Sequence, residues 1–222
     1  MIAPLVKKGV DKFLSVLAII FLSPVMLIAA VGIKLSSNGP VLYRAKRMGK
    51  DGKPFIAYKF RTMRVGADRS GSITALNDTR IFPWGDILRK TKADELPQLF
   101  NILQGTMSII GPRPEDVDIV NKYYTEEEKK TLSVLPGLAS PGSIFNYTHG
   151  GQFLKKETTA ESYAEEFLHI KLALDLYYLK NWSLLYDMEL IARTVYTILV
   201  ISFTRVQLDY PKEYRHVFCS VE

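Results

Sequence analysis

The sequence predicts a mostly helical α+β protein. In it, a re-entrant N-terminal membrane segment, built as helix-break-helix, packs on a small cytoplasmic domain that contains a β-hairpin. Three observations predict this fold class: an uncharged apolar run near the N-terminus, an alternating segment interrupted by Asp-Gly, and long apolar helical patterns toward the C-terminus. Along the 222 residues we therefore expect an anchor over 1–37, a cytoplasmic domain over 38–205 and a C-terminal tail over 206–222.

The apolar run covers residues 13–33 and contains no charged side chain. At about 1.5 Å per residue its length is close to the roughly 30 Å of a bilayer core, so on length alone it is a candidate transmembrane helix. Ser23 and Pro24 stand in its middle, where proline removes a backbone donor and predicts a kink. The Ser23 hydroxyl can bond the carbonyl that the proline leaves free.

Basic residues flank the run on both sides, whereas a spanning helix shows them mainly on its cytoplasmic side. We therefore favour a segment that enters one leaflet, turns at Ser23-Pro24 and returns. A kinked span is the alternative, and a secretory signal peptide is disfavoured because no clear cleavage site follows. The flanking residues are Lys7, Lys8 and Lys12 before the run and Lys34, Arg44, Lys46 and Arg47 after it.

Charge is unevenly distributed along the chain. The net charge is +6, but residues 1–69 carry +10 and the remainder carries −4. No zinc finger, helix-turn-helix or ribonucleoprotein motif accompanies the basic part, which argues against nucleic acid. A membrane surface or a polyphosphate ligand fits its position better, and a merely solvated surface is the alternative. A single cysteine, Cys219, and three scattered histidines predict neither an internal disulfide nor a histidine metal site, so a reducing, cytoplasm-facing body is expected.

The segment 38–63 alternates apolar and polar residues on either side of an Asp-Gly pair, which predicts a β-hairpin. Strands are expected at 41–46 and 55–63. In the second strand, one face would hold Ile56, Tyr58 and Phe60 and the other Lys59 and Arg61, as in a half-buried strand.

Beyond the hairpin the chain is expected to be largely helical. Residues 64–80 are polar and glycine-bearing, as in loops that carry function. The expected elements are a helix over 81–90, a strand over 107–110 ended by Gly-Pro-Arg-Pro, an amphipathic helix over 163–181 and an apolar helix over 184–203. The uncharged end of the last helix is too short to span a bilayer, which leaves a core helix or a helix in the membrane interface.

Pro97 sets the frame of the segment 91–105, because proline is tolerated in the first turn of a helix and disfavoured deeper in it. Asp94 is thereby predicted at or near the helix N-cap and Gly105 at its end. An aspartate there is most often only a cap, but free amides and the helix dipole also attract phosphate oxygens, and both roles are compatible. Glu95 projects about 100° away, so the two carboxylates are expected to have different tasks. The predicted apolar face consists of Leu96, Leu99, Phe100 and Leu103.

Cations accompany these carboxylates. Arg89 and Lys90 come just before them, and two prolines stiffen the turn that carries Arg113. A guanidinium on a rigid backbone suits phosphate, although each arginine taken alone indicates only a surface ion pair.

Three segments, in this order and spacing, closely resemble the bacterial sugar transferase family, also called monotopic phosphoglycosyl transferases: YKFRTM at 58–63, DILRKTKADELPQLFNILQGTMSIIGPRP at 86–114 and YYLKNWSLLYDMEL at 177–190. The resemblance runs from the N-terminal Ser-Pro helix to about residue 205. It implies a reaction in which Asp94 attacks the β-phosphorus of a UDP-sugar, releases UMP and forms a covalent phosphosugar. Polyprenol (undecaprenyl) phosphate then takes the phosphosugar, as the first membrane step of glycan or polysaccharide biosynthesis.

The resemblance also implies the remaining parts of the site. Mg²⁺ is the expected cofactor, with Asp94 sharing in its binding, and Glu95 would assist catalysis. Lys59, Arg89 and Arg113 would bind substrate by neutralising its phosphates. The protein would lie at the bacterial inner membrane, in contact with lipid, with its catalytic domain on the cytoplasmic face.

One region departs from the family pattern. Members commonly carry Pro-Gly-Ile-Thr-Gly with a further arginine some residues on, whereas this chain reads PGLASPGSIFNYTHG over 136–150 and has no arginine there. The contacts to the nucleotide or the sugar are therefore expected to differ, with His149 or another group compensating.

Two other functions fit the same residues: a Mg²⁺-dependent phosphodiesterase or hydrolase that uses water, and a non-catalytic membrane scaffold. A requirement for polyprenol phosphate separates the first from the transferase, and donor turnover separates the second. The transferred sugar, the glycan pathway and the oligomeric state, a homo-oligomer included, stay open at the level of sequence.

Overall fold

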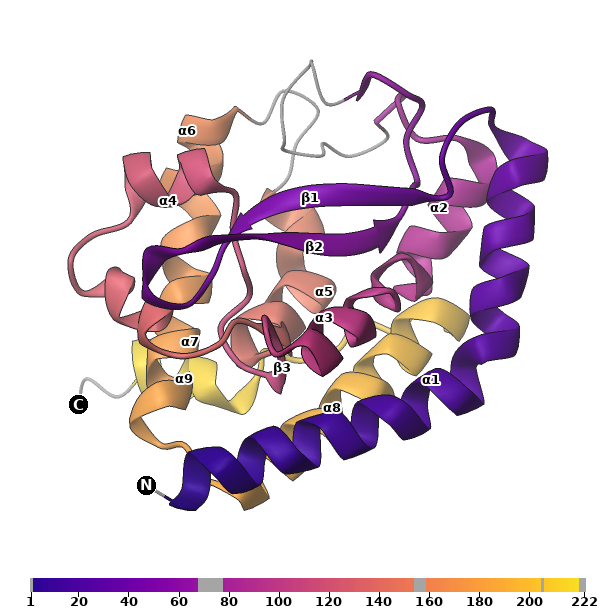
Figure 1. Cartoon of the computed structure of the whole chain (residues 1–222). Coiled ribbons are helices and arrows are strands. Elements are labelled where there is room, and N and C mark those ends of the chain that lie inside the picture. The colour runs from indigo at the N-terminus through magenta and orange to yellow at the C-terminus, as the bar shows by residue number, and fades with distance from the viewer. Residues whose placement is uncertain (1, 68–77, 154–158, 205, 220–222) are drawn as a thin grey trace.

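The computed structural model places a small hairpin across the middle of a helical body, with one long N-terminal helix along two sides of it (Figure 1). It describes residues 2–67, 78–153, 159–204 and 206–219, so most of the expected loop over 64–80 lies outside the described residues. The predicted α+β class, with helices in the majority, is confirmed.

The described elements are helices, short tight turns and two two-stranded sheets. The helices are α1 (Ile2–Ser36), α2 (Pro83–Lys90), α3 (Gln98–Gln104), α4 (Val117–Tyr123), α5 (Pro141–Phe153), α6 (Ala160–Tyr163), α7 (His169–Lys180), α8 (Leu184–Phe203) and α9 (Lys212–Phe218). The strands are β1 (Leu42–Met48) and β2 (Pro54–Phe60), which pair antiparallel, and β3 (Ser108–Ile110) and β4 (Gly137–Ala139), which pair parallel. The tight turns are η1 (Lys50–Gly52), η3 (Ala93–Glu95), η4 (Glu128–Ser133) and η5 (Ala164–Leu168), the last being a π turn.

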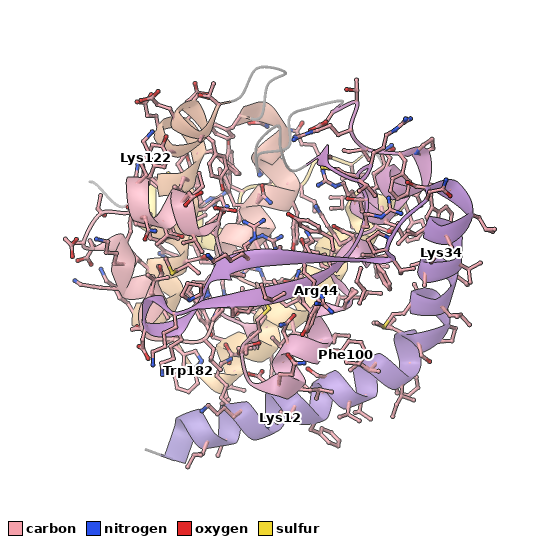
Figure 2. The ribbon with its side chains drawn as sticks, turned by 45° about the horizontal axis from the view of Figure 1, so that its top comes forward. Lys12, Lys34, Arg44, Phe100, Lys122 and Trp182 are labelled. Atoms are coloured by element: carbon pink, nitrogen blue, oxygen red, sulfur yellow. The ribbon has the colours of Figure 1, made fainter. Side chains whose placement is uncertain are left out.

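Helix α1 bends in its middle, so that one arm runs along the base of the body and the other rises beside it (Figure 1). Pro24 lies inside the helix and has no N–H with which to reach the carbonyl of Ile20. The hydroxyl of Ser23 donates to that carbonyl at 2.9 Å, which is the bond expected from the sequence. Figure 2 shows Lys12 on the first arm and Lys34 near the end of the second.

Both arms of α1 contact the body through a narrow set of residues. In the second arm Gly32 lets the ring of Trp84 lie directly on the helix, since a Cβ there would come within 2.3 Å of the indole. The Trp84 Nε1 donates to the carbonyl of Ala29 at 3.3 Å. In the first arm the carboxylate of Asp11 accepts a 2.6 Å hydrogen bond from the Ser108 hydroxyl at the start of β3. The helix is thus fixed to α2 at one end and to β3 at the other.

The predicted hairpin is confirmed, with strand ends shifted by a few residues. Its turn places Asp51 at φ 56° and Gly52 at φ 70°, the left-handed backbone for which Asp-Gly is suited. The clean alternation expected for the second strand is wrong at its start, because Ile56 is 41% exposed while Ala57, on the opposite face, is buried. A sheet of two strands is covered in part on both faces, so burial follows the packed helix α3 and not the alternation.

The later elements match the prediction in part. Helix α8 has the predicted bounds, and α2 begins two residues later than expected because Pro83 occupies its first turn. The helix predicted over 163–181 is confirmed as a continuous helical stretch that ends at Lys180, in which Ala164–Leu168 form the π turn η5. The segment 206–222, expected as a tail, contains α9, whose buried Glu213 bonds Arg193 of α8.

Candidate active site

The two predicted carboxylates lie in a 3₁₀ turn and not at a helix N-cap. Asp94 and Glu95 belong to η3, and the N-cap of α3 is Pro97. The predicted frame is wrong by one turn: the backbone N–H groups of Leu99 and Phe100 reach only three residues back, so the chain tightens before the α-helix begins. Both carboxylate residues are nearly buried, at 4% and 6% exposure.

The apolar face of α3 is also rotated from the predicted one. Leu99 is buried and Gly105 ends the helix at φ 79°, as expected, but Phe100 is 43% exposed and Ile102 is buried. The side chain of Asn101 is buried and makes two hydrogen bonds to the backbone of β2. Its Oδ1 accepts from the Tyr58 N–H, and its Nδ2 donates to the Ile56 carbonyl. This contact holds β2 beside η3, and with it the lysine that β2 carries.

Glu95 is held by an ion-pair network. The guanidinium of Arg113 donates to both of its oxygens, with Nη1 3.0 Å from Oε2, and Lys59 Nζ lies 3.4 Å from Oε1. Burial alone would raise the pKa of Glu95, but the charges of Arg113 and Lys59 outweigh it and hold that pKa below its ordinary value. Glu95 is therefore a fixed anion that orients two cations.

The carboxylate of Asp94 has fewer polar contacts than that of Glu95. Its Oδ2 lies 3.2 Å from Lys59 Nζ, and within the described part of the chain its Oδ1 has no hydrogen-bond partner. Arg89 attracts the same carboxylate and donates from Nε to the Thr62 hydroxyl at 2.9 Å. Burial lowers the pKa of Arg89, and the charge of Asp94 opposes that effect. Asp94 thus has a carboxylate oxygen available among cations.

The structure brings the predicted site residues together from separate segments. Lys59 comes from β2, the two carboxylates from η3, and Arg113 from the turn after β3, while Arg89 reaches the same cluster from α2. Ser23 and Pro24, predicted for the membrane segment, lie on α1 outside this cluster.

Close backbone packing and a buried carboxylate fix the turn that carries Arg113. Gly111 and Gly137 approach so closely that a Cβ on Gly137 would lie 2.1 Å from the Gly111 nitrogen. Asp175 of α7 accepts hydrogen bonds from the N–H of Arg113 at 3.2 Å and from that of Gly142 at 2.9 Å. One buried carboxylate therefore joins the arginine turn to the first turn of α5.

Replacing Asp175 by alanine is expected to lower the free energy of unfolding by about 3 kcal/mol, because two backbone amides lose their acceptor.

Burial raises the pKa of Asp175 from 3.8 to about 6, against the hydrogen bonds from Gly142 and Arg113. The stability linked to this group is therefore full at low pH and is lost as the pH rises through about 6. Between pH 5 and 7.5, the advantage of wild type over Asp175→Asn should fall by roughly 1 kcal/mol in urea titrations. An equal pH slope in both proteins would contradict this assignment.

Two residues of the site were missed by the sequence analysis. The hydroxyl of Tyr147 lies 3.3 Å from Arg113 Nη1 and 3.5 Å from Glu95 Oε2, and Lys92 Nζ lies 4.2 Å from the centroid of the Tyr147 ring. One feature of the sequence could have pointed to Tyr147: it lies in the segment that departs from the family pattern. His149, the suggested compensating residue, instead stacks in an aromatic cluster.

A metal at this site would have few protein ligands. The described residues contain no group of three or more His, Cys, Asp or Glu side chains that could hold an ion. Magnesium, however, is often bound by one or two carboxylates together with water and substrate phosphates. The available oxygen of Asp94 fits that donor set, whereas both oxygens of Glu95 are occupied by Arg113.

Comparison with known proteins adds to this geometry. The model of the family described as bacterial sugar transferase matches residues 2–201. The UDP-N-acetylgalactosamine-undecaprenyl-phosphate N-acetylgalactosaminephosphotransferase of Aeromonas hydrophila is 38% identical over 197 residues, which cover 87% of this chain and 44% of that protein. The UDP-glucose:undecaprenyl-phosphate glucose-1-phosphate transferase of Xanthomonas campestris pv. campestris is 36% identical over 198 residues, 85% of this chain and 38% of that protein.

The chain spans less than half the length of these two relatives. A shorter relative, the exopolysaccharide production protein PSS of Rhizobium leguminosarum bv. phaseoli, is 37% identical over 196 residues, 85% of this chain and 92% of that protein. Since the family model covers nearly the whole chain and these relatives exceed 35% identity over most of it, the chain belongs to the bacterial sugar transferase family.

Proposed function

We propose that this protein transfers a sugar phosphate from a UDP-sugar to polyprenol phosphate and releases UMP, with Asp94 as the nucleophile. The observation that carries the proposal is a nearly buried carboxylate, Asp94, with an available oxygen: it pairs with Lys59, the charge of Arg89 acts on it, and the adjacent Glu95 pairs with Arg113. The printed names of the relatives, which specify UDP-sugars and undecaprenyl phosphate, support this choice of donor and acceptor.

In the first step an oxygen of Asp94 forms a bond to the β-phosphorus of the donor. The bond from that phosphorus to the bridging oxygen breaks, and UMP leaves with the electron pair. In the second step an oxygen of polyprenol phosphate attacks the same phosphorus, and the carboxylate of Asp94 leaves unchanged. The covalent intermediate divides one difficult transfer into two easier steps.

Repulsion between an anionic nucleophile and an anionic diphosphate is the main obstacle to this chemistry. Lys59 and Arg113 lie where they reduce it, because Glu95 holds them in position without itself approaching the phosphorus. Asp94 would share in binding Mg²⁺, which would neutralise phosphate charge and polarise the phosphoryl oxygens. Glu95 is thus proposed as the residue that orients the cations.

Helix α1 supports a membrane location. Within Leu5–Ser36 its most apolar stretch of 18 residues has a mean hydropathy of 2.7 and is only 11% buried, and among the described helices it is the one that could cross a membrane by length and composition. Large apolar side chains around its middle are exposed, among them Ile20 at 61%, Phe21 at 76% and Leu27 at 65%. We propose that the bend enters the cytoplasmic leaflet of the inner membrane and that both ends of α1 face the cytoplasm.

Helix α8 fits the membrane-interface alternative better than the core alternative. Leu185, Tyr196 and Phe203 are 82%, 61% and 78% exposed on it, whereas Thr194 and Thr197 are buried. An exposed apolar stripe beside α1 would lie at the lipid surface, near the phosphate of the acceptor. Holding both reactants at one surface lowers the entropy lost in bringing them together.

Substitution of Ser23 and Pro24 by alanine is expected to straighten α1 and change its topology, because the backbone bond to Ile20 is restored. Single cysteines at Lys8 and Ser37, in a Cys219→Ser background, would report the side of the membrane. With the native pair, both positions should react only from the cytoplasmic side. In the double variant the Lys8 position should become reactive from the periplasm. Periplasmic labelling at Lys8 in the protein with the native pair would refute the re-entrant arrangement.

The proposed activity is tested by incubating the protein with Mg²⁺, polyprenol phosphate and a panel of UDP-sugars while UMP is followed. A transferase releases UMP in turnover only when the lipid acceptor is present. Sustained UMP release without acceptor would instead indicate the Mg²⁺-dependent hydrolase. No release with any donor would indicate the non-catalytic scaffold.

A further inference from the structure

We propose that Lys92 is a further substrate-binding residue of this site: a cation held against the face of Tyr147 that binds a phosphate oxyanion arriving beside Asp94 and Glu95. The inference rests on the proposed function, since the oxyanion belongs to one of the two substrates. It goes beyond that function by giving a role to a cation that lies within the family motif at 86–114 but to which the sequence analysis had assigned none.

The backbone at Lys92 is unusual. Its φ of 56° and ψ of 14° lie in the left-handed region, which a long unbranched side chain rarely occupies. Among the described non-glycine residues only Asp51 also has a positive φ, and Asp51 lies in a hairpin turn that favours it. Lys92 stands between α2 and η3, immediately before the carboxylate turn, where a strained backbone is typical of functional sites.

The ammonium of Lys92 has no carboxylate partner among the residues that the structure describes. Its Nζ lies 4.2 Å from the centroid of the Tyr147 ring, and the nearest negative charges that act on it are those of Glu95 and Asp94. The other close cations differ, because Lys59 pairs with both carboxylates and Arg113 pairs with Glu95. Lysine has three N–H donors, so the contact with the ring leaves donors for an incoming oxygen.

Tyr147 is itself fixed in place. Its hydroxyl lies within hydrogen-bond distance of Arg113 Nη1 and Glu95 Oε2, so the ring cannot turn away from Lys92 without breaking those contacts. It belongs to α5, in the segment where the arginine expected from the family pattern is absent. Lys92 therefore places a positive charge beside α5, a helix that itself contains no lysine or arginine.

The ligand chemistry is a phosphate oxyanion, which both the donor diphosphate and the lipid phosphate carry. Steady-state measurements can separate these sources. The KM for the UDP-sugar is measured at saturating polyprenol phosphate, and the KM for polyprenol phosphate is measured at saturating donor. The KM that changes identifies the substrate that meets Lys92.

The decisive variant is Lys92→Asn, because asparagine tolerates the left-handed backbone and carries no charge. We expect it to raise one of the two KM values about tenfold or more, as for the loss of a charge-assisted hydrogen bond, with an unchanged or higher Tm. Lys92→Gly, which also relieves the strain, should give the same rise, and Lys92→Arg should recover most of the affinity. The matched control is Lys122→Asn, an exposed lysine on α4 (Figure 2), which should leave both KM values at the wild-type level.

Variants of Tyr147 test the same contact independently. Tyr147→Phe keeps the ring under the ammonium, whereas Tyr147→Leu removes it, so the leucine variant should raise the same KM as Lys92→Asn and the phenylalanine variant should raise it less. In the Lys92→Asn background, Tyr147→Leu and Tyr147→Phe should differ little in KM, because both lack the hydroxyl and the contact between the ammonium and the ring is already gone.

The inference is overturned if wild type is active and both KM values of Lys92→Asn stay within twofold of wild type, or if Lys92→Arg is as impaired as Lys92→Asn. The proposed function fails separately, in the absence of any donor turnover by the wild-type protein. In that case the inference falls with it.

Discussion

Replacement of Asp94 by asparagine should reduce UMP release by about 10³-fold or more, because the amide has neither the charge nor the nucleophilic oxygen needed to bond phosphorus. Asparagine has nearly the same volume, so the nearly buried turn η3 should keep its packing. Lys59 also retains Glu95 at 3.4 Å as a partner. We therefore expect the Tm to change little while turnover disappears.

A matched control is Asp86→Asn on α2, a half-exposed aspartate whose partner is Lys90 on the same helix. This variant should retain wild-type turnover. If Asp94→Asn keeps more than about a tenth of wild-type activity, with the same donor and acceptor, Asp94 is not the nucleophile.

The second large effect is expected from Arg113→Met, which should lower the free energy of unfolding by about 3–5 kcal/mol. Removal of the guanidinium leaves Glu95 charged and buried with Lys59 as its remaining cationic partner, and breaking a buried ion pair on one side costs more than removing both partners. Activity should fall as well, since a cation beside the donor is lost. Chemical denaturation and UMP release measure the two effects separately.

The pH dependence follows from the same pair. Because Arg113 and Lys59 hold the pKa of Glu95 below its ordinary value of 4.5, the stability from this pair is present above that pH and is lost as the pH falls further. In Arg113→Met this loss in acid should shrink, because Glu95 then keeps Lys59 as a cationic partner but loses the stronger stabilisation of its charge by Arg113. The double variant Arg113→Met with Glu95→Gln should recover most of the stability and none of the activity. Full activity in the double variant would contradict the roles given to both residues.

The sequence predicted which residues lie together better than it predicted their geometry. Lys59, Asp94 and Arg113 were recognised because the order and spacing of three motifs identify a family, and such motifs need no knowledge of the backbone. The N-cap prediction failed because Pro97 restricts a helix start to its first turn but does not exclude a 3₁₀ turn ahead of it.

Local signals explain which elements were found. Helix α8 was predicted with the correct bounds because it is a continuous apolar segment. Ser183 marks its start by accepting a hydrogen bond from the Tyr186 N–H. Helix α5 begins with Pro-Gly and contains Gly150-Gly151, a composition typical of loops, and its stability comes from packing such as that of the buried Phe145. Such tertiary contacts override local propensity.

Long-range contacts explain what was missed. Strand β4 has three residues and exists through its pairing with β3, almost thirty positions earlier in the chain. The contact between Lys92 and Tyr147 likewise joins residues far apart in sequence and depends on a left-handed backbone. Neither leaves a periodic pattern in the sequence.

The central claim is that a bond forms between Asp94 and phosphorus, and the most direct test is the intact mass of the wild-type protein after mixing with donor and Mg²⁺ in the absence of acceptor. We predict a mass increase equal to one phosphosugar, located on the peptide that contains Asp94, together with one equivalent of UMP. Polyprenol phosphate should then remove the added mass. Continued turnover of donor to polyprenol-diphosphate sugar with no covalent adduct at any time point would contradict the account.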